Sequence, residues 1–257
     1  MTQQDFEYWG LMAQTWDLFR GDTSFWSDRF FFREAVRRYG EPVLDVGCGT
    51  GRLLLDFLAD GVEIDGVDNS PPMLDLCREK AALQGLTAQL YQQPMEELKL
   101  PRRYQTILVP SSSFQLLIEP ALALQAMERF YGHLLPGGVL VMPFMAIWSE
   151  GDPVETEWEL SREATFPDGS VARRWSRAWY DLDRLLEHTE DRYELLRDGL
   201  VVKEELHRRS PATQGYTTAQ ATKLYENAGF GRLEFYQDFT WEAAQPDDRV
   251  ICIVGHK

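Results

Sequence analysis

The distribution of hydrophobic and polar positions predicts that short apolar strands alternate with amphipathic helices. Apolar runs typical of buried strands occupy residues 43–46, 62–67, 88–92, 107–110 and 139–144. The stretches between them repeat apolar residues at the helical period, at 52–58, 71–85 and 120–135. Because such alternation is typical of parallel sheets, it favours an α/β fold with a doubly wound, mostly parallel sheet.

The pattern changes between Gly151 and Thr213. Alternating positions and turn residues there predict further strands, at 154–166, 171–181, 184–196 and 200–209. We interpret them as an antiparallel β insertion after the fifth strand. A helix capped by Thr217 and a hairpin of two strands, 233–239 and 249–254, would then complete a seven-stranded sheet. The aromatic-rich residues 6–38 are expected to form helices that cap the sheet.

A glycine-rich turn joins the first strand to the first of these helices. Gly47, Gly49 and Gly51 stand at alternate positions after Val43–Val46, where glycine permits positive φ and a close approach of backbone N–H groups to a ligand. Dinucleotide sites use Gly-x-Gly-x-x-Gly instead, and here Arg52 occupies the slot of their third glycine. The spacing therefore disfavours a nicotinamide-dependent oxidoreductase.

Two acidic residues give this turn a different ligand preference. Asp45, two positions before Gly47, would repel a pyrophosphate but suits an ammonium group. Asp68 ends the second strand, about 20 residues past the loop, where a carboxylate can accept both hydroxyls of a ribose. Together they predict a pocket for an amino acid joined to a nucleoside, as in S-adenosylmethionine.

The order of the motifs resembles that of class I S-adenosylmethionine-dependent methyltransferases, which have a Rossmann-like fold. The similarity covers roughly the first 145 residues and returns near the C-terminus. It is carried by Asp45 with the glycine loop, Asp68-Asn69, Pro94 to Leu98, Tyr104 to Ser111, and Leu135-Pro136-Gly137-Gly138. The resemblance implies S-adenosylmethionine as cofactor and S-adenosylhomocysteine as product. The cofactor-binding positions that it implies are Trp16, Asp45, Gly47, Cys48, Gly49, Gly51, Asp68, Asn69, Met73, Met95, Glu96, Pro110 and Ser111.

The extent of the resemblance and the change of pattern at Gly151 together divide the chain into three parts. Residues 1–150 would hold the cap helices and the cofactor-binding core, 151–213 would form a lid, and 214–257 would complete the core sheet. The segment from Trp16 to Thr23 also resembles glycine and sarcosine N-methyltransferases. Trp26 replaces the arginine that those enzymes use on the methionine carboxylate, so Arg20 or Arg52 would take that role.

Substrate contacts are less constrained by the sequence than cofactor contacts. Candidate substrate-binding residues are Tyr8, Phe114, Trp175 and Trp179, whose aromatic rings would pack the core or line a pocket. His207, on an expected lid strand, is the candidate general base. The four histidines share no metal-ligand spacing, and no metal is expected.

Composition bears on the partners. The formal net charge of −15, from 26 Lys+Arg against 41 Asp+Glu, disfavours a nucleic-acid substrate and favours a small molecule. The three scattered cysteines favour a reducing cytoplasm. No leader pattern or apolar run of membrane-spanning length is present, so we expect a soluble, cytoplasmic protein. Exposed strand edges in the insertion are also typical of a homodimer interface.

The predicted activity is transfer of a methyl group to a nitrogen or oxygen of a small molecule. Nitrogen is favoured slightly, because a hydroxyl acceptor needs a base and the sequence has few histidines. A cofactor-binding protein without catalysis and a nicotinamide-dependent oxidoreductase are alternatives. A nucleic-acid methyltransferase is another, although the Asn/Asp-Pro-Pro-Tyr motif is replaced here by Val109-Pro110-Ser111-Ser112.

Overall fold

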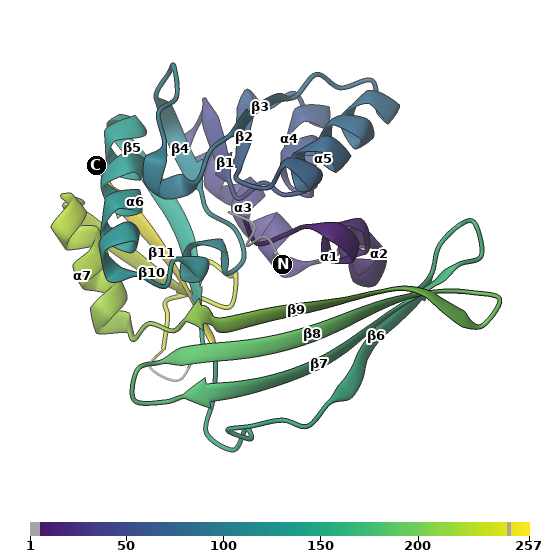
Figure 1. Cartoon of the computed structure of the whole chain (residues 1–257). Coiled ribbons are helices and arrows are strands. Elements are labelled where there is room, and N and C mark those ends of the chain that lie inside the picture. The colour runs from purple at the N-terminus through teal and green to yellow at the C-terminus, as the bar shows by residue number, and fades with distance from the viewer. Residues whose placement is uncertain (1–5, 246–247) are drawn as a thin grey trace.

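A computed structural model of the chain describes residues 6–245 and 248–257, which form two sheets (Figure 1). The larger has seven strands in the order β10-β11-β5-β4-β1-β2-β3. Their bounds are β1 Val43–Val46, β2 Ile64–Asp68, β3 Gln89–Gln92, β4 Tyr104–Leu108, β5 Leu134–Met145, β10 Arg232–Gln237 and β11 Val250–His256. Strands β1 to β5 are parallel, whereas β11 runs antiparallel to both of its neighbours, β5 and β10. The predicted fold class and terminal hairpin are confirmed.

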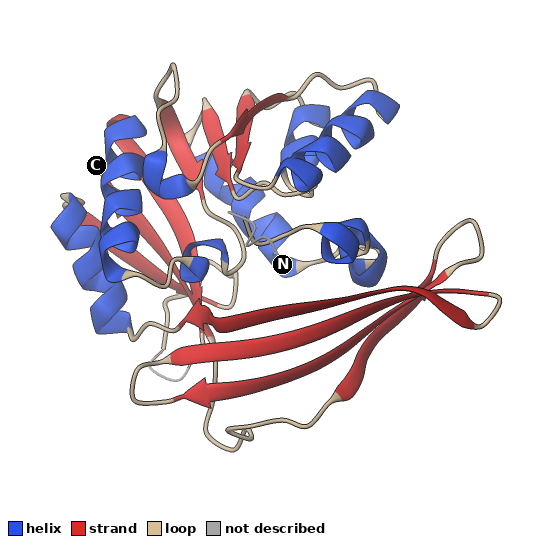
Figure 2. Cartoon of the chain, in the orientation of Figure 1, coloured by secondary structure: helices blue, strands red, loops and turns tan. Residues whose placement is uncertain are grey.

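Helices cover both faces of this sheet (Figure 2). They are α1 Gly10–Gln14, α2 Trp16–Arg20, α3 Ser27–Tyr39, α4 Leu54–Ala59, α5 Pro71–Leu83, α6 Pro120–His133 and α7 Thr218–Ala228, with short 3₁₀ turns η1 Met95–Glu97 and η2 Ser113–Leu116. Phe31 of α3 and Leu54 of α4 pack in one core layer, and Phe130 of α6 and Tyr225 of α7 pack in the other. The two layers bury both faces, as the continuous apolar strands require.

The second sheet is the insertion that the sequence predicts after β5. Its four antiparallel strands are β6 Glu159–Thr165, β7 Val171–Asp181, β8 Leu186–Arg197 and β9 Leu200–Gln214. Strand β6 starts later than expected, since residues 154–158 make only an isolated bridge and two backbone hydrogen bonds with β7. Strand β9 is longer, because Gln214 still pairs with Leu186.

The N-terminal helices divide their packing between the two sheets. Helix α3 covers the central sheet, as expected from its aromatic residues. Helices α1 and α2 lie between the core and the insertion (Figure 1), and Leu11 and Met12 pack against Tyr193 of β8. The expectation that all of residues 6–38 cap the central sheet was therefore wrong for α1 and α2, whose apolar side chains find a partner in the insertion.

Candidate active site

The glycine loop leaves β1 with the left-handed backbone that its sequence predicts. Gly47, Gly49 and Gly51 have φ values of 70°, 55° and 85°. A Cβ on Gly47 would lie 2.8 Å from Ser113 Oγ, so this glycine lets the loop after β4 approach the loop after β1. A Cβ on Gly51 would lie 2.6 Å from Cys77 Sγ, and Gly51 therefore serves the packing of α4 against α5.

A cavity of about 1020 Å³ opens at the carboxyl ends of β1, β2 and β4. This is the edge of an open α/β sheet where ligands bind. Every residue predicted to bind the cofactor lines it except Gly51. Tyr8, Trp9 and Arg20 from the N-terminal segment and residues 206–212 of β9 close the other side.

Asp68 holds the glycine loop from the end of β2. Its Oδ2 accepts the Gly49 N–H at 2.9 Å and its Oδ1 accepts the Ser70 N–H at 2.8 Å. Burial raises the pKa of this carboxyl, and the Ser70 and Gly49 N–H groups oppose that rise. Each oxygen keeps a further lone pair that can accept a hydroxyl from a ligand.

Asp45 is buried in the cavity wall without a hydrogen-bond partner for Oδ1 among the described residues. Burial raises its pKa to about 7, Arg52 opposes the rise, and Asp68 adds to it. A buried carboxylate left unpaired is costly, and a ligand cation would relieve the cost. The two carboxylates are therefore acceptors that match the ammonium and the ribose hydroxyls of an aminoacyl nucleoside.

Known proteins with the same architecture identify that ligand. Residues 43–138 match a family described as a methyltransferase domain. The chain is 27% identical to an inferred methyltransferase of Geobacillus sp. (strain WCH70), with 100% of both proteins aligned. The solved S-adenosylmethionine-dependent methyltransferase from Clostridium acetobutylicum ATCC 824 superposes with a TM-score of 0.77 at 18% identity, covering 96% of this chain and 97% of that one.

The chain therefore carries an S-adenosylmethionine-dependent methyltransferase domain. A further solved structure, the sugar N-methyltransferase KedS8 from Streptoalloteichus sp ATCC 53650, has a TM-score of 0.74 at 20% identity and covers 100% of this chain and 98% of its own. When bound, the cofactor supplies a methyl group already activated on a sulfonium. Among the residues that the structure describes, no helix is long and apolar enough to span a membrane.

Arg20 and Arg52 were both candidates to bind the methionine carboxylate, and their contacts in the structure differ. Arg52 is engaged in an ion pair with buried Asp28. Arg20 stacks on Trp16, with its Cζ 3.3 Å from the ring centroid, and has no acidic partner among the described side chains. Burial lowers the pKa of Arg20 to about 10, so it remains cationic at neutral pH. Tyr8 meets the same indole edge-on at 4.6 Å, which places an aromatic stack beside the free guanidinium.

Three predicted substrate residues of the methyltransferase lie outside the cavity. Phe114 is buried in the core beneath η2, against Phe144 and Tyr216, because its helical turn directs the ring inward. Trp175 and Trp179 lie on one face of β7, whereas Ser176, between them, bonds Asp191 on the other face. The alternation of strand side chains therefore turns both tryptophans away from the cavity. Tyr8 and His207, by contrast, line it.

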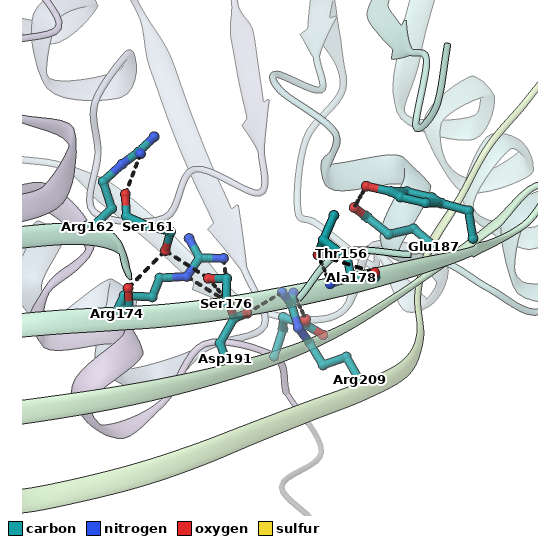
Figure 3. A network of polar contacts seen from close by, with 11 residues as sticks. Thr156, Ser161, Arg162, Arg174, Ser176, Ala178, Glu187, Asp191 and Arg209 are labelled. Carbon is teal, nitrogen blue, oxygen red and sulfur yellow. Dashed lines mark hydrogen bonds and ion pairs between the residues drawn. The ribbon is translucent and has the colours of Figure 1, made fainter. Parts of the chain in front are cut away.

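The inner face of the insertion carries a polar network that sequence reasoning missed (Figure 3). Buried Asp191 accepts hydrogen bonds from Arg174 at 2.8 Å and Ser176 at 2.6 Å, and pairs with Arg209 at 3.2 Å. Arg209 also pairs with Glu7 of the N-terminal segment. The only sequence signal was the alternate placement of polar residues on β8 and β9, and that pattern is equally typical of a solvated strand face.

Proposed function

We propose that this methyltransferase transfers its methyl group to an amine nitrogen of a small, sugar-like molecule. The observation that carries the proposal is the make-up of the acceptor side of the cavity, which β9 and the N-terminal segment line. A concave cavity of about 1020 Å³, shared with the cofactor, is of the size that small molecules occupy, and suits a small acceptor better than a polymer.

The chemistry of the cavity supports nitrogen over oxygen. His207 is the one imidazole that lines the cavity among the described residues. An ammonium group is much closer in acidity to an imidazolium than a sugar hydroxyl is, so an imidazole can take a proton from an ammonium but not from a hydroxyl. The likeness to a sugar N-methyltransferase over the whole chain, including the insertion, points to the same acceptor class.

We propose the following roles at the cofactor end. Asp45 would hold the ammonium, Asp68 the ribose hydroxyls, and Arg20 the carboxylate of the methionyl group. The Arg20→Ala variant should bind S-adenosylhomocysteine roughly 10- to 100-fold more weakly in calorimetry, the cost of losing a charged hydrogen bond. Methylthioadenosine, which lacks the carboxylate, should bind both proteins equally.

The function is tested with matched acceptors. Purified protein is incubated with isotopically labelled S-adenosylmethionine and pairs of sugars that differ only by an amino group in place of a hydroxyl. We expect label on the amino member of a pair, located on nitrogen by mass spectrometry. Label on the hydroxy members alone, or on an added nucleic acid or protein alone, would contradict the proposal.

A further inference from the structure

The wall of the cavity opposite the cofactor loops is built by β9 and the N-terminal segment. Residues 206–212 of β9 line it, and His207 projects from the same face as Glu205 and Arg209, which alternate with it along the strand. Tyr8 and Trp9 lie between this wall and the cofactor loops: the Tyr8 carbonyl accepts the Ser70 hydroxyl, and Trp9 contacts His207. The N-terminal segment therefore joins the wall that carries the imidazole to the loops of the cofactor end.

Glu205 fixes the orientation of that imidazole. Its Oε2 lies 3.1 Å from His207 Nε2, and the same oxygen accepts the Leu11 N–H at 2.6 Å. Lys203 holds the other oxygen at 2.8 Å. A Cβ on Gly10 would fall 2.2 Å from Glu205, so glycine at the start of α1 is what admits the carboxylate. Since a carboxylate only accepts, Nε2 carries the imidazole proton.

The other ring nitrogen is then the basic one. Nδ1 of His207 has no hydrogen-bond partner among the described residues, and His207, although its side chain is only 3% exposed, is one of the residues that line the cavity. Trp9 stacks on the imidazole with centroids 4.1 Å apart, and Tyr193 meets it edge-on at 5.1 Å. Both the Glu205 carboxylate and the indole face favour an imidazolium once a proton arrives.

The charges around the ring keep it neutral beforehand. Burial lowers the pKa of His207, and Arg209 acts in the same direction. Glu205 and Asp191 oppose the shift, while Glu7 is engaged with Arg209. With the net direction downward, the free ring is unprotonated at neutral pH and available as a base.

We propose that His207, oriented by Glu205, is the general base that takes a proton from the acceptor amine. The N–H bond of the ammonium breaks, the proton bonds to Nδ1, and the electron pair stays on nitrogen. That pair then forms the new N–CH₃ bond while the electrons of the C–S bond remain on sulfur. The proton passes from Nδ1 to solvent. This inference rests on the proposed transfer to nitrogen and assigns its acid–base residue.

The first test compares His207→Gln with wild type, using the amino sugar that gives turnover in the matched-acceptor assay. Glutamine keeps an N–H donor toward Glu205 but supplies no base. We expect kcat to fall roughly 10²- to 10⁴-fold at pH 7. The deficit should shrink about tenfold per pH unit as the amine becomes neutral without help. Binding of S-adenosylhomocysteine, measured by calorimetry, should be unchanged.

His188 provides a matched control. Like His207 it stacks on a tryptophan, in this case Trp179, with ring centroids 5.2 Å apart, but it does not line the cavity. His188→Gln should keep the wild-type pH profile. A His207→Gln deficit that is equal at every pH, or that is matched by a loss of S-adenosylhomocysteine binding, would overturn the proposal, since either result assigns His207 a structural role.

A second measurement does not depend on the acceptor. In ¹⁵N-histidine-labelled protein with S-adenosylhomocysteine bound, neutral His207 should carry its proton on Nε2, and Glu205→Gln should change the nitrogen shifts of that ring. A proton on Nδ1 of the neutral ring would overturn the assignment whatever the substrate is. If instead the tautomer is as expected and only hydroxyls are methylated, the proposed function fails by itself.

Discussion

At the residue scale, Asp68 has two roles: it accepts hydrogen bonds from the glycine loop, and we propose that it also binds the cofactor. Asp68→Ala removes the acceptor that we assign to the ribose hydroxyls, at roughly 1.5–3 kcal/mol for a hydrogen bond to a charged group. Calorimetry with S-adenosylhomocysteine should therefore give about 10- to 150-fold weaker binding. The substitution also leaves the Gly49 and Ser70 N–H groups without their acceptor. The thermal unfolding of the variant should therefore be measured as a control for loss of stability. Unchanged affinity would remove Asp68 from the site.

Asp45 predicts a pH dependence of cofactor binding. Its pKa in the free protein is raised to about 7, so the carboxyl is neutral below that pH. Binding of the ammonium group requires the ionised form, and affinity should fall about tenfold per pH unit as the pH drops below 7. Above pH 7 it should level off.

Calorimetry between about pH 5.5 and 8.5 checks this slope. Asp45→Asn, which cannot ionise, should show weak binding with little dependence on pH. Methylthioadenosine, which has no amino group, should bind wild type with a flat profile. A steep profile for methylthioadenosine would mean that another group is titrating.

At the element scale, the insertion acts on both ends of the cavity. We propose that residues 151–213 form a lid, since β9 lines the acceptor side and Arg209 and Glu205 anchor the N-terminal segment. Replacing them with a short loop should abolish methyl transfer, because closure excludes water and positions the acceptor. Binding at the nucleoside end, measured with methylthioadenosine, should largely survive.

The competing view makes the insertion only an association surface. Light scattering on the same deletion distinguishes the two. An inactive protein of unchanged oligomeric state that still binds methylthioadenosine supports the lid. An active monomer produced from a wild-type dimer would refute it.

At the scale of the whole molecule, the two faces of the insertion differ. The inner face packs on α1 and α2, whereas the outer face carries Trp158, Trp175 and Trp179 with Arg177 and Arg192 stacked among them. Trp158 and Leu160, which pairs with Trp175, are 38% and 44% exposed. Exposed aromatic and arginine side chains on one face are typical of association surfaces.

We therefore expect a homodimer formed through the outer face. Light scattering should give twice the mass of one chain. The double variant Trp158→Glu, Leu160→Glu should give a monomer, because two carboxylates at such a contact would be buried without partners. Binding of S-adenosylhomocysteine should be retained, since neither side chain contributes to the cofactor end. A wild-type monomer would contradict the expectation.

The sequence by itself determined the central sheet and the cofactor end of the cavity. Each of those features has a local cause. Apolar runs with helical stretches between them specify parallel strands, and the glycines after Val46 are required wherever the backbone turns with positive φ. The positions of Asp45 and Asp68 could also be predicted, because their distance along the chain from that turn places both of them near strand ends.

Only the tertiary structure decided the acceptor side. A strand alternates its side chains between two faces, and nothing local says which face meets the core, so Trp175 and Trp179 were expected at the cavity and point away. Arg20 and Arg52 are likewise equivalent in sequence until Asp28 engages one of them. The stacking of Trp9 on His207 and the hydrogen bond from Leu11 to Glu205 join residues nearly 200 positions apart, which only the docking of α1 on β9 brings into contact.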